Sequence, residues 1–533
     1  MRHRTPGMVI AACAAAMLAS SACTGGAPAP AEKASTPPVA VPHGQEKFVQ
    51  WPVLPGNEAY VSIDGKHLHT YVVEQAAISR HYRDQGHPQS WGRLVGTSGD
   101  EESAKWFLDK YKQIGLSDVH AQPLDLAPKW FPQSWEVSVT ADGKTMPLVS
   151  ARPGYRGPVT PPGGLDLEVV NAGAGSESEF AGRDVRGKAV LIFSLWGTGP
   201  ASGAMQRAEA KGAAALFNVI TLPGNLQLQY TSQNKVPNFS LGNDDGNKVR
   251  DLIGQVPAGH AHVKIRFDAK EIPNLKSALV WGTLPGATDE TIFVLAHRDG
   301  WFDAAIDNGS GISQQIGLAE YFAMIPQAQR RRTIVFVATD GHHAPGQITK
   351  DDPTGEGGEG EGRTWMRLQG ERKQPLLAKT ALFINCEHPS AVDLVVGSKS
   401  LISTNTSMPN QWYAGGPSRP GLQALAAKVF AEFGVTTYAE PQGQKPPFGE
   451  LGFFYHITPG LVIEALGFHY FHTDLDTPEA VPWTGLESTT RAYAKMIDEV
   501  NKIDLKDLQG PREARPDELM PEAIERATKQ PTQ

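Results

Sequence analysis

Histidines and carboxylates follow several short apolar runs in the sequence. In residues 293–311, the run Phe293-Val294-Leu295 precedes His297 and Asp299, and a turn-rich segment then brings in Asp307. A buried strand that ends in such side chains delivers them to its carboxyl end, where open α/β sheets place their chemistry. This stretch therefore predicts a functional site at a strand end.

Three further stretches supply candidate metal ligands. They are Asp340-Gly341-His342-His343, Asn385-Cys386-Glu387-His388 and, after a last strand and loop, Phe471-His472-Thr473-Asp474. Imidazole nitrogens and carboxylate oxygens suit zinc, and an open coordination position leaves room for a reactive water. One aspartate that lies between two ions can bridge them, and a two-metal site can hold both a nucleophilic hydroxide and a substrate carbonyl.

The elements that must position these residues alternate along the chain. Strand-like runs occur at 278–281, 292–295, 333–338, 381–384 and 461–463, with helical segments between them. This alternation predicts an α/β fold with a mostly parallel, mixed sheet sandwiched by helices. After Asp307, Ile312, Ile316 and Ala319 have the spacing of a helix that packs one stripe against the sheet.

Two more helices are expected from local patterns. Ser98-Gly99-Asp100-Glu101 has the spacing of a capping box and predicts a helix from about Asp100 to Ile114, which Gly115 ends. The alanine-rich run from Ala208 to Phe217 predicts another helix. Cys386 and His388 are expected to be structural, and Asp476 is expected to brace the His472 loop.

The N-terminal segment is predicted to be a targeting sequence, residues 1–23. Arg2 and Arg4 precede an apolar core too short to span a bilayer, and small residues lead to Cys23. This pattern resembles a bacterial lipoprotein signal, although Ser20 stands where that signal usually has leucine. An ordinary secretory leader is the alternative. Residues 24–45, rich in Ala and Pro, suit a flexible tether, and the protein is expected to be exported.

The remaining chain divides into segments that differ in amino-acid composition. Residues 46–147 and 271–509 are expected to form the two parts of a catalytic α/β domain, and residues 510–533 a polar tail. Between the two parts, residues 148–270 are rich in Gly, Pro and short β-type runs. They resemble the protease-associated domain, a small β-rich module, and contain no reactive constellation, so a lid or spacer is expected.

Composition narrows the possible partners. The 533-residue chain has a formal net charge of -8 and no long Lys/Arg run, which argues against nucleic-acid binding. Its three cysteines allow no disulfide framework in the mature part. Membrane contact is expected only through a lipid anchor at Cys23, and no feature indicates an oligomer.

The motifs together resemble the zinc aminopeptidase and glutamate carboxypeptidase family, the prostate-specific membrane antigen-like peptidases. His297 to Asp307 matches the family's first motif, Phe336 to His343 the second, Ile384 to Glu387 the third and His472 the last. The resemblance implies two zinc ions and cleavage of a peptide or amide substrate by metal-activated water. His297, Asp307 and Glu387 would hold one zinc and Asp307, His343 and His472 the other, while Asp299 would orient His297.

The second motif departs from the family, which has two adjacent glutamates where this chain has His342 and His343. His343 can still bind zinc, and His342 would have to act as the general base, with Asp340 as a possible substitute. The departure leaves open a non-catalytic protein that binds peptides or metal, for which the transferrin receptor is the family precedent. A cyclising transferase related to glutaminyl cyclases is a third reading. For an exopeptidase, Arg298 could bind a substrate carboxylate and Glu450 a substrate amine.

Overall fold

The structure, a computed structural model, describes residues 44–194, 203–343, 366, 377–415, 421–439, 447, 449–455, 458–465 and 469–509. The predicted leader with Cys23, almost all of the linker 24–45 and the tail 510–533 lie outside these residues. Within the described part, no helix has both the length and the apolar character needed to cross a bilayer.

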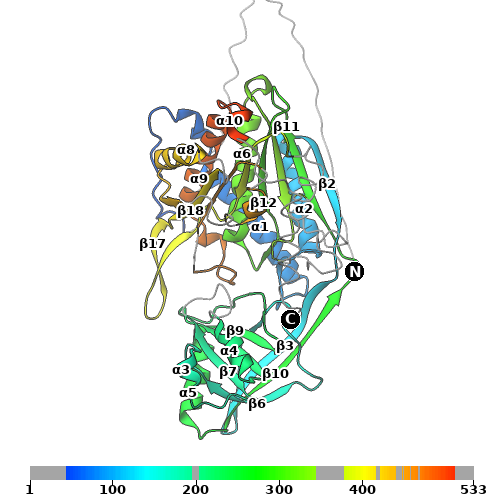
Figure 1. Ribbon diagram of the computed structural model, residues 1–533, viewed down its shortest axis with the longest axis vertical. Coiled ribbons are helices and arrows are strands. Elements are labelled where there is room, and N and C mark those ends of the chain that lie inside the picture. The colour runs from blue at the N-terminus through cyan, green and yellow to red at the C-terminus, as the bar shows by residue number, and fades with distance from the viewer. Residues whose placement is uncertain are drawn as a thin grey trace, which may run out of the picture. The chain divides into compact units, whose positions relative to one another are not determined.

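The candidate ligands follow strands of an eight-stranded mixed sheet, called here the first sheet (Figure 1). Its strands, in spatial order, are β19 (Thr437–Ala439), β18 (Asn410–Gly415), β20 (Gly460–Glu464), β15 (Thr380–Cys386), β12 (Thr291–His297), β14 (Thr333–Thr339), β11 (Lys276–Leu284) and β2 (Ser117–Asp125). Strands β20, β15, β12 and β14 are neighbours and run parallel, so their carboxyl ends lie along one edge. The predicted mostly parallel, mixed sheet is confirmed.

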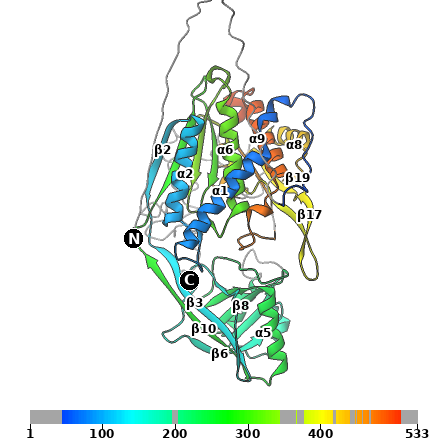
Figure 2. The same ribbon diagram turned by 180° about the vertical axis from the view of Figure 1, so that it is seen from behind.

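Helices cover the first sheet. Figure 2 shows α1, α2 and α6 across one face, and α9 packs against α1 and α6 in the same layer. The α-helices of this part, among the residues that the structure describes, are α1 (Gly65–Asp84), α2 (Ser98–Ile114), α6 (Gly311–Ala323), α8 (Gly421–Glu432), α9 (Trp483–Val500) and α10 (Leu505–Gln509). The helix predicted after Asp307 is therefore present as α6, and the one predicted to end at Gly115 is α2, capped by Gly115 with a φ of 89°.

Both faces of the first sheet are buried, which explains the continuous apolar runs. On β12, Ile292 and Val294 belong to the helix-side core, whereas Phe293 and Leu295 point into a second core on the opposite face. Cys386 is fully buried in the helix-side core, as expected from its place on a strand.

A second sheet of eight strands occupies the segment between β2 and β11. Its order is β4 (Lys144–Pro147), β3 (Lys129–Ala141), β10 (Ala261–Ile272), β6 (Leu165–Asn171), β7 (Ala189–Ser194), β8 (Ala215–Ile220), β9 (Asn238–Leu241) and β5 (Arg152–Pro153), with helices α3 (Glu177–Phe180), α4 (Ala204–Ala210) and α5 (Asn243–Gln255). It includes β3 and β4, so it begins at Lys129, earlier in the chain than residue 148. Two short pairs complete the fold: β1 (Gly92–Arg93) with β13 (Gly300–Trp301), and β16 (Val392–Val396) with β17 (Leu401–Ser407).

Two local predictions are wrong. The helix predicted over Ala208–Phe217 ends as α4 at Ala210, and β8 begins at Ala215 because its side chains are buried on both faces of the sheet. The predicted capping box is also absent: Ser98 lies inside α2, and Asp100 instead accepts a hydrogen bond from the amide of Gly96.

The same Asp100 forms a buried ion pair with Arg298, whose guanidinium also donates to Ser277 Oγ and Ala278 O, each at 2.8 Å. Removing one partner leaves an uncompensated buried charge. We expect Asp100→Asn to lower the free energy of unfolding by about 3–5 kcal/mol in urea denaturation. The control Asp109→Asn breaks an exposed pair with Lys105 on the same helix and should cost below about 1 kcal/mol. Equal denaturation midpoints for the two variants would contradict this assignment.

Candidate metal centre

The carboxyl ends of the four parallel strands bring the predicted ligands together. His297 ends β12, His343 follows β14, and Glu387 follows β15. His472 lies in the loop after β20, and Asp307 lies in the helical turn Ala305–Ser310 that leads into α6. His297, His343 and His472 therefore converge on Asp307, whereas Glu387 lies in a separate donor group with His297, His342 and Glu450.

Asp307 lies between four histidines. Its Oδ1 is 3.2 Å from His297 Nε2 and 2.9 Å from His388 Nε2. Its Oδ2 is 3.1 Å from His343 Nε2 and 3.0 Å from His472 Nε2. Each carboxylate oxygen thus has two imidazoles of its own, which is an arrangement suited to a carboxylate that bridges two ions.

The turn that carries Asp307 is held by Asp476. The amides of Ile306 and Asp307 donate to the two carboxylate oxygens of Asp476, at 2.6 and 3.1 Å. Asp476 therefore holds the turn of Asp307, whereas the sequence analysis expected it to hold the loop of His472. Burial raises the pKa of Asp476 to about 7.

The electrostatics of the centre reflect its burial. Burial alone would raise the pKa of Asp307, but the surrounding imidazoles, His343 and His388 foremost, hold it well below its usual value. Burial lowers the pKa of His472 to about 4. His472 is therefore a neutral imidazole at pH 7, the form that binds a metal.

The donor atoms fit a metal ion. His297 Nε2, His472 Nε2 and Asp307 Oδ1 are buried, and beyond the imidazole–carboxylate contacts given above none makes a hydrogen bond in the described part of the chain. Buried polar atoms are otherwise almost always paired, and a bound cation would satisfy all three. In four groups, the potential ligand atoms lie within 4.8 Å of one another: His297, Asp307 and His388; Asp307, His343 and His472; His297, Asp299 and His343; and His297, His342, Glu387 and Glu450. Imidazole with carboxylate is a donor set of zinc.

Asp299 contacts two of these ligands, His297 and His343. Its Oδ2 accepts a hydrogen bond from the amide of His343 at 2.8 Å, and its carbonyl oxygen is 3.1 Å from His297 Nδ1. Its Oδ1 is 3.7 Å from the same ring nitrogen. Asp299 therefore positions His297 and the His343 backbone.

His342 faces a pair of buried glutamates. Its Nδ1 hydrogen bonds Glu450 Oε1 at 2.5 Å, and its Nε2 is 3.9 Å from Glu387 Oε1. Burial and the nearby Glu450 raise the pKa of Glu387 well above its usual value, whereas the pKa of Glu450 is held low, despite burial, by His342. The ring of His342 also stacks on His297, with centroids 4.1 Å apart.

The structure changes the roles of three residues. His388 was expected to be structural, yet its Nε2 lies 2.9 Å from Asp307 Oδ1. Arg298 is fully buried by its pair with Asp100, and Glu450 is fully buried against His342, so neither can bind a substrate terminus. Asp340 belongs to none of the donor groups found among the described residues.

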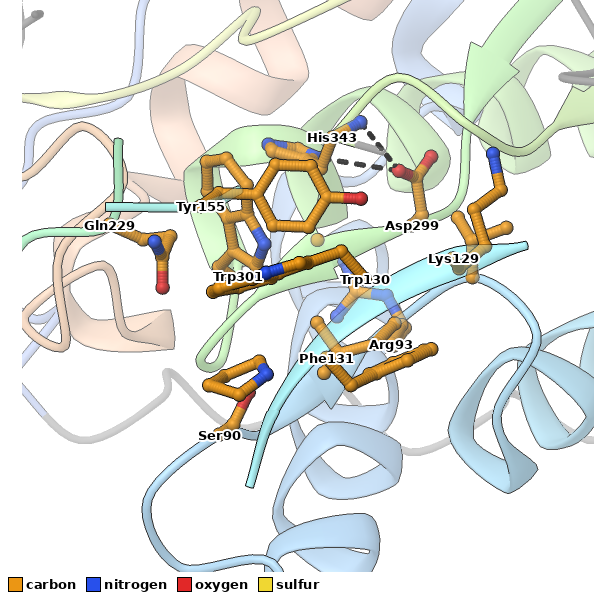
Figure 3. Close-up of a pocket in the computed structure, with 14 residues that line it drawn as sticks. Ser90, Arg93, Lys129, Trp130, Phe131, Tyr155, Gln229, Asp299, Trp301 and His343 are labelled. Carbon is orange, nitrogen blue, oxygen red and sulfur yellow. Dashed lines mark hydrogen bonds and ion pairs between the residues drawn. The ribbon is translucent and has the colours of Figure 1, made fainter. Parts of the chain in front are cut away.

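An aromatic pocket adjoins the centre (Figure 3). Trp301 forms its wall, with ring centroids 4.6 Å from His343 and 4.8 Å from His472. Tyr155 and Trp130, from the segment of the second sheet, continue that wall, and their rings lie 5.4 Å apart. The pocket therefore joins the metal centre to side chains from the segment of the second sheet.

The same segment holds the loop of His472. The amide of Gln229 donates to the carbonyl of His472 at 2.9 Å, and the amide of Gln227 donates to Asp474 Oδ1 at 2.9 Å. Leu228 and Thr473 form a bridge between these two hydrogen bonds. The segment thus fixes the backbone that carries one candidate ligand.

Part of the chain is similar in sequence to known proteins. Residues 280–497 match the sequence profile of peptidase family M28. Mouse carboxypeptidase Q is 22% identical over 237 residues, which are 41% of this chain and 49% of that protein, so the chain spans about half the length of this curated relative.

Two solved structures have a similar fold. A zinc aminopeptidase from Bacillus subtilis matches with a TM-score of 0.55, and a peptidase M28 precursor from Shewanella amazonensis with 0.57. Each is 16% identical, and each match covers 85% of this chain and 99% of the other. The segment matched by the profile contains every candidate ligand from His297 to His472, and the two solved structures share the fold.

Proposed function

We propose that this chain is an exported metallopeptidase that hydrolyses peptide or amide bonds at a site with two zinc ions. The observation that carries the proposal is Asp307, each of whose oxygens faces two imidazoles. The first metal position would be formed by His297, Asp307 Oδ1 and Glu387, and the second by Asp307 Oδ2, His343 and His472. The prostate-specific membrane antigen-like organisation with a protease-associated insert is part of this proposal, supported by the second sheet between β2 and β11.

Zinc held there would polarise a substrate carbonyl and make a water acidic enough to attack near neutral pH. The protein's own part is to move a proton. With Nδ1 bonded to Glu450, His342 keeps Nε2 to accept the proton of the attacking water and to pass it to the leaving amine. Asp299 keeps the His343 backbone and His297 in place during this transfer.

The test is digestion of a mixed peptide library by the purified chain, with added zinc and with a chelator, followed by mass spectrometry. Cleavage that the chelator abolishes and zinc restores is expected, and the trimmed ends will identify an aminopeptidase or a carboxypeptidase. A folded, zinc-loaded protein that cleaves nothing would overturn the proposal.

That negative outcome would favour a second function, a binding protein for peptides or metal without turnover. The replacement of the family's two glutamates by His342 and His343 favours this alternative. Tight zinc binding with no hydrolysis would distinguish it from the enzyme.

The cellular location is a further part of the proposal. Residues 1–23 support export, and Cys23 supports a lipid anchor, in the manner of a bacterial lipoprotein. Metabolic labelling with palmitate should mark the wild-type protein and leave Cys23→Ser unlabelled. Export of an unlabelled wild-type protein would favour an ordinary secretory leader.

The aromatic pocket predicts the substrate preference. Its wall of Trp301, Tyr155 and Trp130 suits an apolar side chain beside the scissile bond. We expect kcat/KM for such a residue to exceed that for alanine at least about 10-fold. Trp130→Ala should reduce the preference, and Trp51→Ala, at an exposed tryptophan outside the pocket, should not. A preference for acidic residues would contradict the prediction.

A further inference from the structure

A second cavity adjoins the aromatic pocket on the side away from the metal centre. The two share three lining residues, Ser90, Phe131 and Pro132. Figure 3 shows Ser90 and Phe131 on the opposite side of the aromatic pocket from His343 and Asp299. The second cavity, called here the outer cavity, therefore lies beyond the aromatic pocket when viewed from the metal centre.

The outer cavity has the size of a ligand site, and the fold holds its walls in place. Its volume is about 480 Å³, and ligand pockets in proteins measure roughly 300–1,000 Å³. One wall is the loop that follows α1. In this loop, Gln89 Nε2 donates to the carbonyl of Trp135 at 3.1 Å, and the carbonyl of Gln89 accepts from the guanidinium of Arg152 at 2.7 Å. The ring of His87 stacks on Tyr82 of α1, with centroids 4.1 Å apart, so the loop is tied to α1, β3 and β5.

The side chains around the outer cavity suit an uncharged ligand. Within the part of the chain that the structure describes, no Asp, Glu, Lys or Arg lines it. Apolar side chains such as Leu275 alternate with amide and hydroxyl groups such as those of Gln133 and Thr97. This mixture can cover apolar side chains and still form hydrogen bonds with the amides of a peptide.

The outer cavity also borders a strand edge that lacks a strand partner. Strand β3 pairs with β10 over Lys129–Ala141 but with β4 only over Ser138–Ala141, and no other described strand pairs with β3. Residues 131–133 of this edge line the outer cavity. An exposed strand edge is a template on which an extended peptide can add a further strand.

We propose that the outer cavity binds the part of a peptide substrate that extends beyond the aromatic pocket, and that the preferred substrates are oligopeptides with uncharged residues at that end. This inference rests on the peptidase function proposed above and adds the substrate class to it. The aromatic pocket takes the side chain beside the scissile bond, and the peptide continues along the edge of β3. Binding energy from residues remote from the scissile bond can be used to raise kcat.

Kinetics with peptides of increasing length test the substrate class. Peptides that share the residues at the scissile bond are lengthened by one alanine at a time, at either end, starting from a dipeptide. At one end, lengthening should raise kcat/KM at least about 10-fold over the dipeptide, mainly through kcat. Equal kcat/KM at every length would overturn the inference and leave the proposed function standing. Failure to cleave any of these peptides would overturn both.

A charge introduced into the outer cavity tests its location. Gln133 is exposed on β3, so Gln133→Glu should fold normally. In long peptides that differ only at the distal residue, this variant should shift the kcat/KM ratio of lysine over glutamate about 2–5-fold above the wild-type ratio, the effect of one exposed ion pair. A general structural defect would lower the rates of both peptides alike and leave their ratio unchanged.

The control Thr406→Glu places the same charge at an exposed residue of β17 that lines a different cavity, and it should keep the wild-type ratio. The inference requires both the gain with length and the shift in Gln133→Glu. If Gln133→Glu keeps the wild-type ratio, the distal residues bind elsewhere and the inference is overturned.

Discussion

Replacing Asp307 with asparagine should abolish the binding of both zinc ions and lower kcat/KM at least about 10³-fold. Asp307 is the carboxylate that meets imidazoles on both of its oxygens, so no neighbour can take its place. Asparagine has the same shape but lacks the negative charge that offsets two dications. The loss therefore reports on ligand charge and not on packing.

Metal content by mass spectrometry and peptidase activity are measured together on this variant. Asp303→Asn is the matched control, because Asp303 is a buried aspartate of the same loop whose carboxylate pairs with Arg80 and not with the histidines. The control should keep two zinc ions and its activity. An Asp307→Asn protein with full zinc content and full activity would remove the basis of the proposed centre.

Much of this centre could be predicted from the sequence, because strand ends carry their own signal. An apolar run buried on both faces reads as a strand, and His297, His343 and Glu387 each follow such a run. Parallel neighbours then place these ends along one edge. The convergence on Asp307 follows from strand order, which periodicity alone does not give.

The position of His388 beside Asp307 could not be predicted from the strand pattern. Consecutive residues of a regular strand point to opposite faces, so a ligand at Glu387 implies that His388 points away. The backbone at His388 turns into the left-handed region, and this breaks the alternation and lets both residues face the centre. A non-glycine residue in this conformation has no reliable local signal.

Glu450 could not be assigned for a different reason. It lies in the short helix Glu450–Phe453, far along the chain from His342, and only tertiary folding brings the two side chains together. The helix predicted over Ala208–Phe217 failed because a short apolar run is compatible with either a buried strand or a helix. In both cases the structure is determined by contacts between residues that are distant in the sequence.

Substitutions in the hydrogen-bonded pair of His342 and Glu450 should reduce activity without loss of metal. His342→Gln should keep two zinc ions and lower kcat by about 10²–10⁴-fold, because general acid–base help is removed from the proton transfer. Glu450→Gln should lower kcat less, since it leaves His342 in place but removes the charge that holds Nδ1. KM should change little in both variants, because neither side chain is required to bind the substrate.

Restoring the residue of the related peptidases gives the most discriminating comparison. His342→Glu would place a third carboxylate beside Glu387 and Glu450, which are already buried together, and like charges at such distances raise one another's pKa values. We therefore expect His342→Glu to be a poor enzyme and the double variant with Glu450→Gln to be several-fold better, because the second change removes one of the competing charges. The rates of the two variants and their zinc content are compared under the same conditions. If His342→Gln has the same kcat as the wild type, proton transfer does not pass through the His342 ring. If the wild type is inactive and the double variant gains activity, the chain is a binding protein that has lost its general base.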